Sequence, residues 1–103
     1  GEEFLVMLTG IEPRQALQWT LMLKKRIEDL KISHASDNFL PYVTVSMGLA
    51  CCQTGQGRSF EQIREEADRA LYDAKYSGRA CLSYNKKIYA QLNAYQYRKR
   101  ANA

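Results

Sequence analysis

Two long amphipathic segments alternate with three short apolar runs, and this alternation constrains the fold most strongly. Residues 13–31 and 59–77 repeat apolar side chains at the spacing of a helix with one buried face. Residues 4–8, 42–50 and 80–84 are short runs typical of strands. Strands that alternate with helices predict a layered α/β (or α+β) sandwich. At 103 residues we expect one small domain.

The first helix should begin at Pro13, because proline is favoured at the first helical position. Leu17, Leu21, Ile27 and Leu30 share one predicted apolar face. Its predicted polar side contains Gln18, Lys24, Lys25 and Glu28.

The remaining elements carry clear local signals. In residues 42–50, apolar residues alternate with small ones, which predicts a strand with a close neighbour on its second face. Ser59 and Gln62 form a capping-box pattern at the start of the second helix, and Gly78 is placed to end it. We expect residues 4–8 to form a buried strand and residues 86–97 to form a short helix.

Composition excludes several classes of protein. Charged residues make up 25% and hydrophobic residues 46% of the chain, a balance that argues against intrinsic disorder. No apolar run approaches the roughly 20 residues needed to span a bilayer. The three cysteines have no CxxC spacing, which argues against a zinc site and a disulfide framework. Reduced structural thiols in the cytoplasm are the simpler interpretation.

The whole chain has a net charge of +4, and positively charged residues are concentrated in its last stretch. Residues 85–103 form a basic, tyrosine-rich tail. One interpretation is a patch for phosphate, RNA or a membrane surface. The other is a solvated basic terminus.

Four motifs in order resemble one known family. Residues 1–4 read GEEF, residues 43–50 VTVSMGLA, residues 67–75 ADRALYDAK and residues 77–79 SGR. Together they resemble the C-terminal part of a GGDEF domain, the family of diguanylate cyclases. The resemblance covers residues 1–84 and leaves the tail of residues 85–103 outside it.

The resemblance implies a partial nucleotidyl-cyclase-like palm in the order strand, helix, strand, helix, strand, with the N-terminal portion of the domain missing. In the family that portion holds a metal-binding aspartate, the residues that grip guanine and the inhibitory RxxD site. We therefore expect an incompletely paired sheet, uncovered apolar surface and no cyclase activity in the 103-residue chain alone. A parent protein is expected to carry an upstream sensory domain, and membrane anchoring through that part stays open.

The family's reaction joins two GTP molecules into cyclic di-GMP and releases pyrophosphate, with Mg²⁺ (or Mn²⁺) as the metal. By resemblance, Glu2 and Glu3 are the catalytic and metal-binding acids, and Gly1 lets the substrate approach the backbone. Lys75 and Arg79 would bind the triphosphate. The simpler alternatives are two solvated acids and two cations that complement a helix dipole.

Three functional hypotheses remain open. The first is a diguanylate cyclase domain whose parent acts in the cytoplasm as a homodimer, each half holding one GTP. The second is a degenerate regulatory domain that binds nucleotide or a protein partner without catalysis. The third is an RNA-binding module, suggested by Tyr84, Tyr89, Tyr95 and Tyr97. It ranks last, and we expect no nucleic-acid partner, because the strands lack a glycine-aromatic RNA-binding signature.

Overall fold

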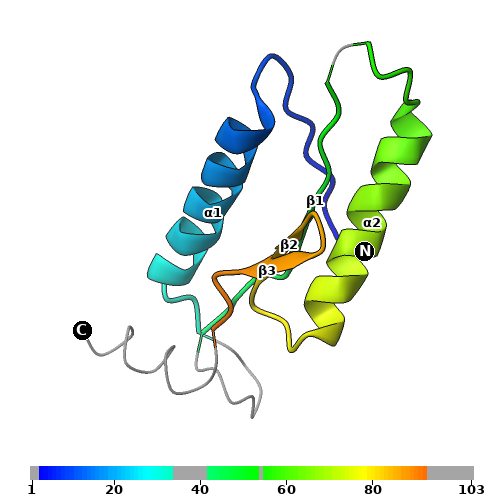
Figure 1. Cartoon of the computed structure of the whole chain (residues 1–103). Helices are drawn as coiled ribbons and strands as arrows, with labels where there is room; N and C mark the ends of the chain where they lie inside the picture. The colour runs from blue at the N-terminus through cyan, green and yellow to red at the C-terminus, as the bar shows by residue number, and fades with distance from the viewer. Residues whose placement is uncertain (1–2, 34–41, 54, 93–103) are drawn as a thin grey trace.

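The structure is a computed structural model that describes residues 3–33, 42–53 and 55–92 (Figure 1). Its elements follow the order α1 (Pro13–Asp29), β1 (Met47–Leu49), α2 (Phe60–Tyr76), β2 (Leu82–Tyr84) and β3 (Lys87–Tyr89). The strands form one sheet in the order β1-β2-β3, with β1 parallel to β2 and β3 antiparallel to it. This small α/β arrangement, with α1 and α2 flanking the strands, agrees with a partial GGDEF fold.

Helix α1 begins where the sequence predicts, but it buries a different face. Pro13 occupies its first turn, and the preceding backbone N–H of Glu12 donates to Gln15 Oε1 at 3.0 Å. The buried residues, four apart along one stripe, are Ala16, Thr20, Lys24 and Glu28.

The predicted polar position of Lys24 and Glu28 is therefore wrong, and Leu30, predicted on the apolar face, is 67% exposed. The physical reason is charge pairing. Lys24 and Glu28 form an ion pair, and Lys24 Nζ also donates to the Ala90 carbonyl at 2.9 Å. A buried charge is tolerated when it is paired and hydrogen-bonded in this way.

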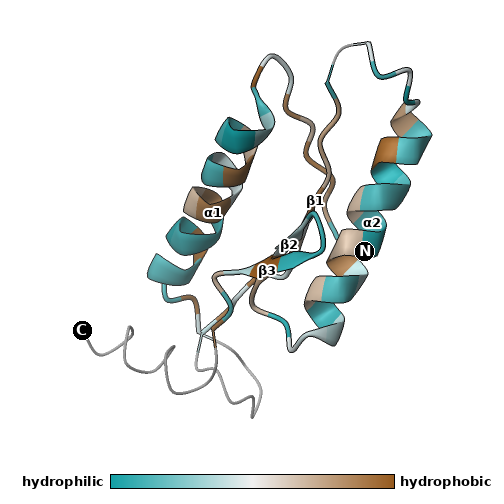
Figure 2. Ribbon diagram, viewed as in Figure 1, coloured by the Kyte–Doolittle hydropathy of each residue, from teal (hydrophilic) through white to brown (hydrophobic). Residues whose placement is uncertain are grey.

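The predicted strand of residues 4–8 is also wrong, because this segment has no strand assignment and its side chains are exposed, Phe4 by 92%. A strand requires a hydrogen-bonded neighbour, and within the described residues none pairs with it. Apolar colouring dominates the extended segments between the helices (Figure 2). The expected uncovered apolar surface is therefore present.

Strand β1 is shorter than the predicted strand of residues 42–50, but the close neighbour on its small-residue face is confirmed. A Cβ placed on Gly48 would lie 2.2 Å from Leu71 N and 2.4 Å from Ala67 O. Both atoms belong to the backbone of α2, so this helix lies directly on the strand. Only glycine allows that approach.

Helix α2 has both of its predicted ends. Ser59 caps the first turn, since Gln62 N donates to Ser59 Oγ at 3.2 Å and Ser59 N donates to Gln62 Oε1 at 2.8 Å. The last turn is followed by Gly78 with a φ of 114°.

The predicted helix over residues 86–97 is wrong for its described part. Residues Lys87–Tyr89 form β3, which pairs with β2 across a two-residue turn. The turn residues Asn85 and Lys86 have φ of 51° and 63°, as a type I′ hairpin turn requires. The rest of that segment, residues 93–97, lies outside the described residues. The boundary between a domain of residues 1–84 and a tail of residues 85–103 stays a prediction, although β3 joins the sheet.

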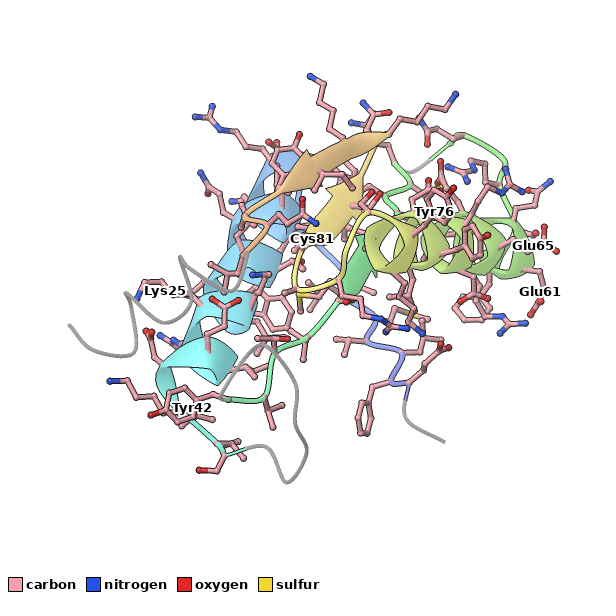
Figure 3. All side chains as sticks on the ribbon, turned by 90° about the horizontal axis from the view of Figure 1, so that it is seen from below. Lys25, Tyr42, Glu61, Glu65, Tyr76 and Cys81 are labelled. Carbon is pink, nitrogen blue, oxygen red and sulfur yellow. The ribbon has the colours of Figure 1, made fainter. Side chains whose placement is uncertain are left out.

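Buried positions lie between the helices. Cys81 and Leu82 are fully buried, and Ala80 and Leu92 pack against Tyr42. Figure 3 shows Cys81 between the two helices, while Glu61 and Glu65 project away from α2. The helices of the described part are all too short or too polar to cross a membrane.

Candidate functional site

The C-terminal end of α2 and the turn after it contain two predicted phosphate-binding residues, Lys75 and Arg79. Arg79 N–H donates to the Ala74 carbonyl at 3.0 Å, and Gly78 N–H donates to the Lys75 carbonyl at 3.3 Å. These two bonds form a Schellman motif, which closes a helix through a left-handed residue. Lys75 therefore lies in the last turn, and Arg79 is the third residue after the helix.

The turn after α2 stays in the left-handed region for three consecutive residues. Gly78, Arg79 and Ala80 have φ of 114°, 66° and 52°. For residues other than glycine this conformation is disfavoured by roughly 1–2 kcal/mol. Ser46 helps to hold it, because its Oγ accepts a hydrogen bond from Ala80 N–H at 3.1 Å. Such strained backbone positions are frequent at functional sites. Here Arg79, one of the strained residues, is also a predicted site residue.

One signature acid meets a predicted phosphate-binding cation. Lys75 Nζ lies 2.7 Å from Glu3 Oε2, although the two residues are 72 positions apart. Their side chains are 34% and 62% exposed. The hydrogen bond from Lys75, together with its positive charge, holds the pKa of the Glu3 carboxyl below its ordinary value. The start of the described chain is thus brought beside α2 (Figure 1).

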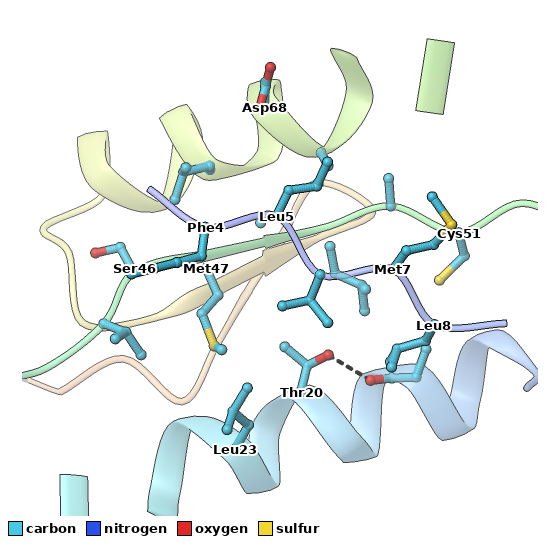
Figure 4. Close-up of a pocket in the computed structure, with 18 of the residues that line it drawn as sticks. Phe4, Leu5, Met7, Leu8, Thr20, Leu23, Ser46, Met47, Cys51 and Asp68 are labelled. Carbon is cyan, nitrogen blue, oxygen red and sulfur yellow. Dashed lines mark hydrogen bonds between the residues drawn. The ribbon is translucent and has the colours of Figure 1, made fainter. Parts of the chain in front are cut away.

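A groove adjoins this ion pair. It is lined by residues 3–9, by residues 44–52 and by the facing sides of α1 and α2. Phe4, Leu5, Met7 and Leu8 run along β1, opposite Leu23 of α1 (Figure 4). Most of the lining is apolar, and its charged residues are Glu3, Arg64, Asp68, Lys75 and Arg79.

Two other polar groups that line the groove have partners on their own helices. The Thr20 hydroxyl donates to the Ala16 carbonyl at 2.7 Å (Figure 4). Asp68 lies within 3.9 Å of Arg64 on α2. Glu3 and Lys75 are likewise paired with each other, so a polar ligand that binds here would have to replace that contact.

The structure thus brings together Glu3 and Lys75 and places Arg79 in the adjoining turn. Gly1 and Glu2 lie outside the described residues, so their assignment stays a prediction. Sequence reasoning did not single out Ser46, although it belongs to the motif of residues 43–50. Its role depends on a turn 34 residues away.

The residues present fit a metal site only in part. Carboxylate oxygens are the ligands that Mg²⁺ prefers, and the Glu3 carboxylate is exposed beside a cation that suits phosphate. Within residues 3–33, 42–53 and 55–92, no group of three acidic, histidine or cysteine side chains is close enough to hold a metal. Mg²⁺ commonly uses one or two carboxylates together with substrate phosphates, so a single described acid is compatible with it.

The fold and this ion pair define a small α/β domain with a candidate phosphate-binding turn. Residues 1–81 match the family model described as "Diguanylate cyclase, GGDEF domain". The chain therefore belongs to the GGDEF-domain family.

Individual relatives agree with this assignment. The chain is 33% identical to diguanylate cyclase A of Treponema denticola over 84% of its length, covering 22% of that protein. It is 33% identical to diguanylate cyclase DgcS of Shewanella oneidensis over 79% of its length, covering 25% of that protein. It is also 32% identical to the uncharacterized protein YtrP of Bacillus subtilis over 85% of its length, covering 14%. The chain thus spans a quarter or less of the length of these relatives, and no solved structure matches it.

Proposed function

We propose that this chain is the C-terminal part of a diguanylate cyclase domain, whose whole protein condenses two GTP molecules into cyclic di-GMP and pyrophosphate. The contact that carries the proposal is the one between Glu3 and Lys75. It joins the acidic signature to the phosphate-binding helix end across 72 residues. Membership of the GGDEF family and two relatives named diguanylate cyclases support it.

The acidic residues would bind the metal ion, and the basic residues would bind the phosphates. Glu2 and Glu3 would hold Mg²⁺ or Mn²⁺, which when bound neutralises phosphate charge and favours deprotonation of the attacking 3′-hydroxyl. Lys75 would contact the triphosphate as a mobile point charge and Arg79 as a planar fork. In the structure the Lys75 ammonium group forms an ion pair with the Glu3 carboxylate. We expect it to exchange this partner for a phosphate group when GTP binds.

The product contains two nucleotides, so we propose that the protein acts as a homodimer with one GTP in each half. A cytoplasmic site of action and an upstream sensory domain belong to the same proposal, because GTP is a cytoplasmic substrate and the relatives are several times longer than this chain.

The test is cyclic di-GMP formation by the full-length protein with GTP and Mg²⁺, measured by chromatography. We expect product with the wild type, loss of at least 100-fold in Glu3→Gln, and loss on addition of a chelator. Glu65→Gln, on the outer side of α2, is the matched control and should retain activity. The 103-residue chain alone should form no product.

Two other results would change the assignment. Tight GTP binding without product, in the presence of Mg²⁺ or Mn²⁺, would favour the degenerate regulatory domain. Equal activity of Glu3→Gln and wild type would remove Glu3 from the site.

A further inference from the structure

The segment that follows β3 contacts three other parts of the molecule through three successive residues. We call residues 90–92 the clasp. It joins α1, the C-terminal end of α2 and the left-handed turn that carries Arg79. The contacts are Lys24 Nζ to the Ala90 carbonyl at 2.9 Å, Gln91 Nε2 to the Ser77 carbonyl, and Leu92 N–H to the Ala80 carbonyl at 3.1 Å.

The clasp brackets the strained turn from both sides. Ser77 precedes Gly78 and Arg79, and Ala80 follows them. Positive φ at Arg79 and Ala80 persists only where surrounding contacts determine the backbone. The hydrogen bonds from the clasp to Ser77 and Ala80 supply such contacts at both ends of the turn.

Within the described residues, Gln91 makes the one side-chain hydrogen bond between the clasp and this turn. Ser77 follows the last residue of α2, where carbonyl groups lack partners inside the helix. The Gln91 amide donates to that carbonyl, and its nitrogen lies 3.0 Å from the position of a Cβ on Gly78.

Buried groups hold the clasp in place. Lys24 is 1% exposed and Leu92 is 5% exposed. Leu92 packs against Ala80 within the core, so the main chain on either side of Gln91 is fixed. A fixed main chain lets one amide side chain restrain the turn.

We propose that Gln91 is a positioning residue for the substrate triphosphate. It contacts no substrate itself. By holding the turn of residues 77–80, it would fix the backbone from which Arg79 reaches the groove that Lys75 also lines. The inference rests on the proposed function, since the phosphates belong to GTP.

The test compares Gln91→Met with wild type in the full-length protein. Methionine keeps the length of the side chain and removes the donor. Loss of one hydrogen bond should accelerate hydrogen exchange about five-fold in a peptide covering residues 77–82. KM for GTP should rise about three- to five-fold while kcat changes less than about two-fold, because weaker binding of the phosphates affects ground and transition states alike.

Gln62→Met is the matched control, because the Gln62 side chain accepts a hydrogen bond from Ser59 N–H at the opposite end of the same helix. It should destabilise α2 to a similar degree without changing KM. Equal KM shifts in both variants would show a general stability effect and overturn the inference. Faster exchange with an unchanged KM would also overturn it.

Failure of the proposed function has a different signature. In that case the wild type forms no product, and if it also fails to bind GTP, the positioning role falls with the proposed function. A wild type that binds GTP, with identical constants in Gln91→Met, would overturn the positioning role alone.

Discussion

The Glu3–Lys75 pair gives a pH-dependent signal at the scale of a single residue. The Glu3 carboxyl has a lowered pKa, so the contact is complete above its ordinary value of 4.5 and is lost as pH falls through the folded value. In Lys75→Met the pKa of Glu3 should rise toward 4.5, because its main hydrogen bond and its nearest cation are both removed. Carbon-13 NMR titration of the Glu3 carboxyl measures this. Lys25→Met, which removes a cation paired with Asp29, should leave that pKa unchanged. An unshifted pKa in Lys75→Met would contradict the pairing.

Lys24 and Lys25 are neighbouring residues whose substitutions should affect stability to very different degrees. Lys24 is buried with Glu28, whereas Lys25 and Asp29 have side chains 67% and 58% exposed. Lys24→Met removes the cation beside a buried carboxylate and the donor to a clasp carbonyl. We expect a loss of about 3 kcal/mol in the free energy of unfolding. Lys25→Met should change it by no more than about 0.5 kcal/mol. Urea denaturation measures the free energy of unfolding of both variants. Similar losses in the two would show that the buried Lys24–Glu28 pair contributes no more to stability than the exposed Lys25–Asp29 pair.

At the scale of elements, sequence reasoning succeeded where the signals are local. Both ends of α2 follow from neighbouring residues, namely the capping pair at Ser59 and Gln62 and the left-handed Gly78. These contacts span three or four residues, so the sequence contains them directly.

Sequence reasoning failed where distant residues decide the outcome. The apolar run of residues 4–8 needs a hydrogen-bonded neighbour to become a strand. The burial of Lys24 depends on Ala90, 66 residues away. The family motifs predict Lys75 and Arg79 as site residues, whereas Ser46 and Gln91 contact the turn through tertiary hydrogen bonds that no local pattern indicates.

The packing of α2 on β1 allows a further test at this scale. In Gly48→Ala the new Cβ would overlap backbone atoms of Leu71 and Ala67, which cannot rotate away as a side chain can. The helix must shift, and we expect a loss of about 3 kcal/mol in the free energy of unfolding. Gly57→Ala is the comparison, because its Cβ meets no atom within 4 Å and only its φ of 67° opposes the change. It should lose about 1 kcal/mol. Equal urea midpoints for the two variants would contradict close packing at Gly48.

At the scale of the whole molecule, the groove leaves apolar side chains in contact with water. Small side chains dominate the buried apolar set of the described part, in which Leu82 and Leu92 are the largest members. The exposed run of residues 4–8 lies along the groove instead of filling a core. Contiguous exposed apolar surface of this kind binds hydrophobic probes. We therefore expect the 103-residue chain to enhance the fluorescence of anilinonaphthalene sulfonate while it remains folded.

Two methionines locate the binding surface of the probe. Met7 is 63% exposed and lines the groove, whereas Met22 is 43% exposed on α1 and does not line it. Met7→Gln should lower the fluorescence enhancement, because a polar amide replaces a thioether in the groove, and Met22→Gln should leave it close to that of the wild type. Circular dichroism of each variant checks that helix content is unchanged. Equal effects of the two substitutions would show that the probe does not bind along residues 3–9.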